Sequence, residues 1–259
     1  ARFGYAECAD GIRALLADLR TDEKAPQATL RRLRDLGEAA SAFDAWDRFD
    51  HKAAAILGSL AERHASLKPY AACRGAHSAI DAVADILAAT GREAAQIAAI
   101  DLRLAPFLMD MCGSARLETL AGAQMSLGYA LAVQRVFGRV DLAQYANAAR
   151  DDSRVAAFIP QVRFHPDPAM DQMSEPVVTV TFTDAATRTD MVPRATGSTE
   201  RPMSDAAIRA KFDSLAGMVL PVPQADGLAD FVLGIEGQGD CRDLPGLLVA
   251  TRPEAPVFA

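Results

Sequence analysis

The sequence of 259 residues contains no long apolar run, and only 6% of its residues are aromatic although half are hydrophobic. No window approaches the roughly eighteen uninterrupted apolar residues that indicate a membrane-spanning helix. The N-terminus also lacks the basic-then-apolar pattern of a signal peptide. The shortage of aromatic residues, together with an excess of alanine, favours close-packed helices over a β sandwich. We therefore expect a cytoplasmic protein without a membrane partner.

Positive charge is scarce as well. The formal net charge is −7, and no run of lysine or arginine interrupts the acidic sequence. Such a chain attracts nucleic acid or an anionic membrane only weakly, so neither is an expected partner. An anionic substrate would need a local cationic pocket.

The four cysteines are dispersed and form no Cys-x-x-Cys pair, which argues against a zinc ribbon and against a dense disulfide framework. Three glycines between Gly234 and Asp240 do not follow a clear strand with Gly-x-Gly-x-x-Gly spacing, so dinucleotide binding is not indicated. We predict reduced thiols, no metal and no cofactor. The cysteines are Cys8, Cys73, Cys112 and Cys241.

The segment from Ser66 to Asp85 contains most of the residues suited to chemistry. Pro69 disfavours the α conformation in the residue before it, so the segment should begin as an extended chain or at a strand edge. Apolar residues then recur at helical spacing and predict a helix from about residue 76 or 77. The first free N–H groups of that helix, with Lys68 and Arg74, would form a cradle for a carboxylate or phosphate. The helical apolar residues are Ile80, Val83, Ala84 and Leu87.

Each polar residue of this segment has an ordinary interpretation beside the functional one. Lys68 is either a surface lysine or an amine that binds a carboxylate or moves a proton. Arg74 is either in an ion pair or anchors a carboxylate through two hydrogen bonds. His77 is either a packed or capping residue or a general acid-base catalyst. Cys73 is either a small packing residue or a nucleophile, and with His77 it makes only half of a zinc site.

The rest of the chain predicts an α+β fold in which helices pack on a small, mainly antiparallel sheet. Helices are expected at 9–20, after Pro26, at about 49–63, at 119–137, from Asp141 to Arg150 and from Ser204 onward. Alternating or β-branched runs predict strands at 96–104, 161–165, 176–183 and 187–194, with a loop around Pro106. The predicted organisation is a helical segment at 1–65, an α+β domain at 66–199 and a helical return at 200–259.

The run from Lys68 to Asp81 resembles the signature segment of the MmgE/PrpD family, which includes 2-methylcitrate dehydratases, cis-aconitate decarboxylases and iminodisuccinate epimerases. The resemblance extends from about residue 60 to residue 245 and is specific as an ensemble. Further blocks agree in order: Gln124–Ala130 followed by Gly138–Val140, the strand Val177–Phe182, and Pro202–Asp205 leading into Lys211–Phe212.

The resemblance implies an all-α domain interrupted by an α+β domain, with a cofactor-independent site for small di- or tricarboxylates in the cleft between them. Lys68 corresponds to the active-site lysine of the family, and Arg74 and His77 to positions that face the cleft. Tyr129 follows a Ser-x-Pro-Tyr pattern in which Gly128 replaces the proline. The candidate catalytic residues are Lys68 and His77, and the candidate substrate-binding residues are Arg74, Tyr70 and Tyr129.

These residues predict a lyase of the dehydratase type that abstracts a proton next to a carboxylate. An epimerase or decarboxylase of the same family is an alternative. A non-catalytic fragment or subunit is another, because family members carry a long N-terminal helical half that supplies an aspartate and a histidine. Only the last helices of that half have counterparts here, and the sequence starts at Ala1 as if inside a longer protein. The expected partners are a small polycarboxylate and a second copy in a homodimer, with an upstream helical half as a further requirement.

Overall fold

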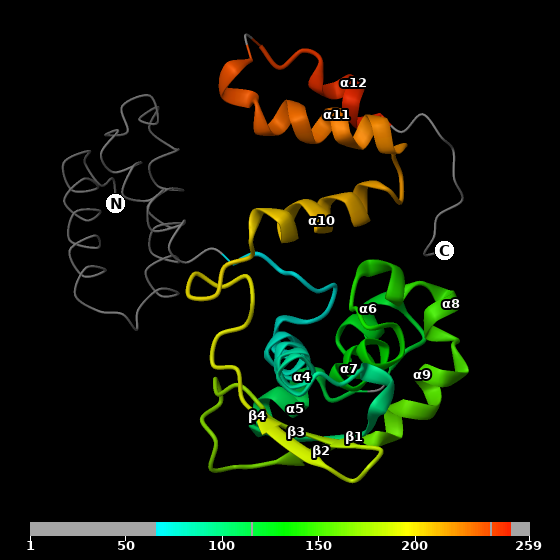
Figure 1. Cartoon of the computed structure of the whole chain (residues 1–259), viewed down its shortest axis with the longest axis vertical. Helices are drawn as coiled ribbons and strands as arrows, with labels where there is room; N and C mark the ends of the chain where they lie inside the picture. The colour runs from blue at the N-terminus through cyan, green and yellow to red at the C-terminus, as the bar shows by residue number, and fades with distance from the viewer. Residues whose placement is uncertain (1–65, 115, 239, 250–259) are drawn as a thin grey trace, which may run out of the picture. The chain divides into compact units, whose positions relative to one another are not determined.

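The computed structural model describes residues 66–114, 116–238 and 240–249 of the chain (Figure 1). The chain divides between His64 and Ala65 into two compact units, and all described residues belong to the second. The helices predicted at 9–20, after Pro26 and at about 49–63 lie outside the described residues.

A four-stranded mixed sheet with the strand order β2-β1-β3-β4 forms the base of the described unit. Strand β1 pairs in parallel with β2 and antiparallel with β3, and β3 pairs antiparallel with β4. All four predicted strands are present, and with the helices they confirm the α+β class. The strands are β1 (Ile97–Leu104), β2 (Val162–Pro166), β3 (Val177–Phe182) and β4 (Thr187–Asp190).

The sheet has one apolar face and one polar face because its strands alternate in sequence. Val178, Val180 and Phe182 of β3 are buried, while the threonines between them lie on the opposite face. On that polar face Asp101 of β1 pairs with Arg163 and His165 of β2, at 2.6 and 2.8 Å. Helices α4 (His77–Thr90), α5 (Pro106–Cys112) and α7 (Leu127–Phe137) lie on the other side of the sheet (Figure 1).

The main core forms where these helices meet the apolar face of the sheet. Apolar residues all along β1 and α7 belong to it, which explains why α7 has no exposed residue in its first two turns. In the part of the chain that the structure describes, five 3-10 turns connect the elements: η2 (Arg74–Ala76), η3 (Ala94–Gln96), η4 (Leu142–Tyr145), η5 (Ile159–Gln161) and η6 (Ile235–Gly237). The helices around this core are α4 (His77–Thr90), α5 (Pro106–Cys112), α6 (Leu120–Gln124), α7 (Leu127–Phe137), α8 (Asn147–Arg150) and α9 (Ser153–Phe158).

Three sequence-based expectations are corrected in this region. The single helix predicted at 119–137 is two, because the Ser126 hydroxyl accepts the Tyr129 N–H and starts a new helix. The loop predicted around Pro106 is helix α5, with proline at its first position, where its missing N–H costs nothing. The helix predicted from Asp141 is η4 followed by α8, interrupted by the extended Ala146.

The C-terminal part is helical, as predicted, and has an apolar cluster of its own. Ser204 caps the first of its helices by accepting the Ala207 N–H, as its sequence position predicted. Among the described residues, no helix has both the length and the apolar composition to cross a membrane. The helices are α10 (Asp205–Ala216), α11 (Val222–Leu233) and α12 (Leu244–Leu248), and the cluster contains Ala216, Leu220, Ala225 and Leu228.

The turn between β3 and β4 yields a test of the fold. Ala185 has a left-handed backbone with φ +65°, in a hairpin closed by hydrogen bonds from Ala185 N to Phe182 O and from Phe182 N to Ala186 O. Ala185→Gly should relieve about 1–2 kcal/mol of strain against a smaller entropic cost, a net stabilisation of about 0.5–1 kcal/mol in urea unfolding. Ala186→Gly, which gains no such relief, should destabilise the protein. A loss of stability in Ala185→Gly would refute the strained turn.

Candidate functional site

Residues 66–73 form a loop rather than a strand edge, and hydrogen bonds to separate segments hold it. Leu67 N donates to Gly197 O at 2.9 Å, and Cys73 N donates to Gln124 O at 2.7 Å. Pro69 has no N–H, so the loop cannot form a continuous ladder with a neighbouring strand. The loop then enters η2 and α4 directly.

Two of the predicted site residues converge on one backbone oxygen. The carbonyl oxygen of Ala72 lies 3.5 Å from Lys68 Nζ and 3.2 Å from His77 Nε2. Since a carbonyl only accepts hydrogen bonds, Nε2 of His77 must carry the proton, which leaves Nδ1 as a free lone pair. Nδ1 is buried and has no hydrogen-bond partner among the described residues. The structure thus places an unprotonated ring nitrogen beside the Lys68 segment.

The imidazole of His77 is neutral at physiological pH. Burial lowers the pKa of His77 to about 4; the Ala72 carbonyl opposes this shift, and the positive charges of Arg74 and Lys68 reinforce it. Its side chain is completely buried, whereas Lys68 is exposed. The buried neutral imidazole of His77 and the exposed ammonium of Lys68 therefore share the Ala72 carbonyl as a hydrogen-bond partner.

Tyr70 connects this pair to a buried carboxylate that sequence reasoning missed. Its hydroxyl donates to Asp81 Oδ1 at 2.5 Å, and its ring packs edge-on against the His77 ring with 5.3 Å between centroids. The other oxygen of Asp81 accepts the Thr196 N–H at 2.6 Å. Burial and the Asp81 carboxylate raise the pKa of Tyr70, so it remains a phenol. Asp81 lies one helical turn after His77, a spacing that could have indicated a shared face.

The loop of residues 195–201, which follows β4, fixes the same region. Arg201 forms two hydrogen bonds of 2.9 Å with the Asp85 carboxylate, and Gly197 N donates to Arg201 O. The residues from Ala195 to Arg201 are thereby held against α4 and against Leu67.

Arg74 and Tyr129 do not share the contact to the Ala72 carbonyl, although the positive charge of Arg74 acts on His77. The Arg74 guanidinium lies 3.4 Å from the Glu175 carboxylate, and 42% of the Arg74 side chain is exposed. Such a surface ion pair contributes about 0–1 kcal/mol to stability, so the guanidinium remains open to another anion. Tyr129 is completely buried in α7, where its hydroxyl donates to Gln144 O at 2.6 Å and burial raises its pKa to about 12. Its substrate-binding role stays a prediction.

The anion cradle predicted at the start of α4 is not formed there. The 3-10 turn η2 precedes the helix, so the His77 N–H donates to Arg74 O, and the first residues of α4 are buried. The expectation failed because the sequence shows where a helix begins but not whether that end is covered.

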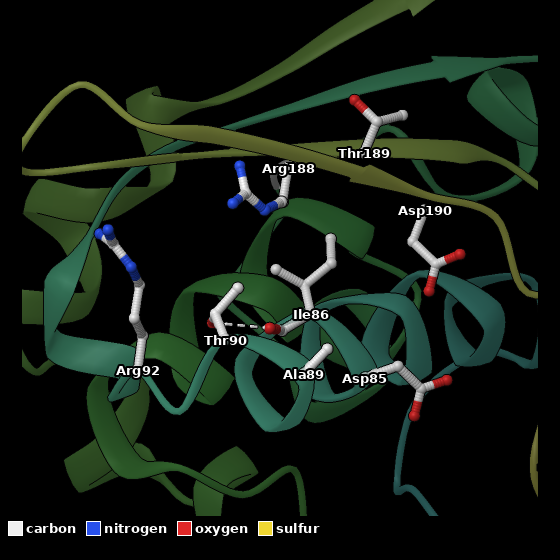
Figure 2. Close-up of a pocket in the computed structure, with 8 residues that line it drawn as sticks. All are labelled: Asp85, Ile86, Ala89, Thr90, Arg92, Arg188, Thr189 and Asp190. Carbon is white, nitrogen blue, oxygen red and sulfur yellow. Dashed lines mark hydrogen bonds between the residues drawn. The ribbon is translucent and has the colours of Figure 1, made fainter.

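A groove of about 480 Å³ lies between α4 and β4, away from the predicted site residues (Figure 2). Arg92 and Arg188 lie towards one end of it, and Asp85 and Asp190 towards the other (Figure 2). Arg92 and Asp85 each form a two-bond ion pair with a residue that does not line the groove. Two of the four charged groups that line the groove are therefore already neutralised by other residues.

A smaller cavity of about 270 Å³ borders the Lys68 loop. Pro69 and Ala71 line one side of it, and Lys211 and Leu215 of α10 line another. It therefore offers space for a small molecule next to the predicted site. In the described ranges, no three His, Cys, Asp or Glu side chains are grouped as a metal site would require.

The comparison with protein families decides the relationship. The MmgE/PrpD C-terminal domain matches residues 70–235, more than half of the chain. The chain belongs to the MmgE/PrpD family. No curated protein matches it.

The MmgE/PrpD domain match includes Tyr70, Arg74, His77 and Tyr129, and it begins two residues after Lys68. The match also covers charged residues to which the sequence analysis assigned no role. Among them are Asp81 and Asp85 of α4 and Arg209 and Lys211 of α10. The family is mostly enzymatic and includes dehydratases, decarboxylases and epimerases, so membership leaves the reaction open.

The contact between Gly197 and Leu67 can be tested by substitution. Gly197 has φ +89°, and a Cβ atom there would lie 1.9 Å from Leu67 O. Gly197→Ala should therefore cost at least about 3 kcal/mol of unfolding free energy. Gly91→Ala is the matched control, because Gly91 has φ +63° with open space around it and should lose only about 1 kcal/mol. Urea unfolding measures both losses. Equal losses of unfolding free energy in Gly197→Ala and Gly91→Ala would show that Gly197 does not pack tightly against Leu67 O.

The burial of neutral His77 predicts a pH dependence of stability. The unfolded chain protonates histidine below its ordinary pKa of about 6.5, whereas the folded chain does so only below about 4. Stability should therefore fall as the pH falls through this window, and His77 should account for about 2–3 kcal/mol between pH 7.5 and 4.5. The measurement is urea unfolding across this range. His77→Gln should flatten the pH slope and the exposed His165→Gln should retain it; an unchanged slope in His77→Gln would contradict a buried neutral imidazole.

Proposed function

We propose that the chain is a cofactor-independent lyase of the MmgE/PrpD type, which acts on a small di- or tricarboxylate by proton abstraction next to a carboxylate. The observation that supports this most is the meeting of Lys68 and His77 at the Ala72 carbonyl. An exposed ammonium, a partly exposed guanidinium and an unprotonated ring nitrogen are the groups that such chemistry uses.

Each residue has a distinct role in this proposal. Arg74 binds a substrate carboxylate in place of its long contact to Glu175. Lys68 stabilises the negative charge that develops as the carbon acid loses its proton, and it can return a proton to the product. His77 accepts a proton at Nδ1, the ring nitrogen without a partner. Because Nδ1 is buried, the exposed residues 66–68 must shift to admit the substrate or a water molecule.

Dehydration, decarboxylation and epimerisation all develop charge beside a carboxylate, so the same residues serve each of them. We place dehydration first and keep an epimerase or decarboxylase as alternatives within the family. The proposed partners remain a small polycarboxylate, a second copy of the chain and an upstream helical half that would supply the remaining acid or base.

One observation favours a second candidate function. His77 and Tyr129 are both completely buried, so a chain without access to them could bind a carboxylate through Lys68 and Arg74 without converting it. Such a non-catalytic chain would bind the substrate but not turn it over.

The test is a direct assay of the full chain with 2-methylcitrate, cis-aconitate and iminodisuccinate. Lys68→Met should lower kcat/KM by at least about 100-fold, because one well-placed charged donor contributes roughly that factor. Arg188→Met, which removes an exposed cation of β4, should leave the rate unchanged. EDTA should not affect turnover.

The outcomes separate the candidates. Binding of these acids by calorimetry without turnover would support the non-catalytic alternative. Full activity in Lys68→Met would refute the site assignment, and inhibition by EDTA would refute a metal-independent reaction.

A further inference from the structure

We propose that Lys211 is a positioning residue that holds the backbone of Lys68. Its ammonium donates a hydrogen bond to the backbone oxygen of Lys68, although the two residues are 143 positions apart. Lys211 lies on α10, so this bond joins the C-terminal helices to the loop that precedes α4. The inference rests on the function proposed above for Lys68.

Within the described residues, the backbone of residues 67–69 makes few other hydrogen bonds. Leu67 N donates to Gly197 O, and Pro69 has no N–H to donate. The Lys68 side chain is exposed, and its contact to Ala72 O is long at 3.5 Å. Residues 67 and 68 are therefore held by two backbone contacts, one from Leu67 N to Gly197 O and one from Lys211 to the Lys68 oxygen, whereas the loop from Tyr70 onward is held by Asp81, Val140 and Gln124.

The two contacts differ in kind. The Gly197 contact joins backbone to backbone. It leaves no room for a side chain, because a Cβ at Gly197 would overlap Leu67 O. The Lys211 contact is a charge-assisted hydrogen bond from a long side chain, which is stronger than a neutral one. Removing the ammonium would leave the Lys68 carbonyl to water and free the loop on that side.

Lys211 also lines the cavity of about 270 Å³ beside Pro69 and Ala71, so direct contact with a substrate is the competing role. A substrate contact would act mainly on KM, whereas misplacement of Lys68 would act mainly on kcat. The exchange of backbone amides in the loop separates the two roles without any need for turnover, because only positioning changes the loop in the free protein.

The experiment uses the full chain with three variants. Lys211→Met removes the donor, Lys211→Gln keeps a neutral donor, and Lys211→Arg keeps a charged one. Arg209→Met is the control, because Arg209 lies on the same helix and pairs with Asp213 and Asp226 instead of the loop. Hydrogen exchange of the peptide containing residues 66–70 is measured first, and kcat and KM second.

We expect Lys211→Met to accelerate exchange of the Leu67 amide about tenfold, from the loss of one charge-assisted hydrogen bond. Lys211→Gln should show a smaller effect, Lys211→Arg should restore most of the protection, and Arg209→Met should match the wild type. In the activity assay kcat should fall about tenfold in Lys211→Met with KM within about threefold.

Unchanged exchange in both Lys211→Met and Lys211→Gln would overturn the proposal, and so would a rise in KM at constant exchange. If Lys211→Met does not fold, Lys211→Gln decides by the same criteria. A chain without turnover on any of the three acids would refute the proposed function, but the exchange measurement would still decide whether Lys211 holds the loop.

Discussion

The Asp81 carboxylate is buried in the first half of α4, and both of its oxygens accept hydrogen bonds from other segments. Tyr70 brings the loop of residues 66–73 to it, and the Thr196 N–H brings the loop of residues 195–201. Loss of either donor would leave a buried charge short of a partner, at a cost of several kcal/mol. The arrangement of Lys68, Tyr70 and His77 depends on this one carboxylate, although Asp81 itself lies below the surface.

The neutral state of His77 follows from the same packing. The imidazole is enclosed by the Tyr70 ring on one side and by the Ala72 carbonyl at Nε2, and no carboxylate of the described residues is bonded to its ring. Two cations, Lys68 and Arg74, stand near it. A proton on Nδ1 would thus add a third positive charge in an apolar setting, so the ring holds a proton only while a negative charge is present. A carboxylate substrate would supply that charge at the moment of transfer.

The sequence predicted elements with local signatures and missed features that depend on distant residues. Val178, Val180 and Phe182 alternate with threonines, and Ser204 stands before an apolar helical pattern; both signals are complete within a few residues. Proline starts a helix as readily as it ends one, so the sequence did not distinguish a loop at Pro106 from the start of helix α5. Thr196, which donates to Asp81, and Lys211, which donates to the Lys68 carbonyl, are more than a hundred residues away from those partners in the chain, so no periodicity could show these contacts. The first turns of α4 are also buried by contacts with distant residues, so the sequence did not show that this helix end is covered.

Strand β4 lies at one edge of the sheet and turns Arg188 and Asp190 towards α4, on the same side as the buried valines of β3. A strand from another molecule could add to this edge only by covering these two charges. The cost of that desolvation discourages edge-to-edge association of the sheet. In the described part of the chain, the charges that line the groove thus also disfavour the addition of a further strand at the β4 edge.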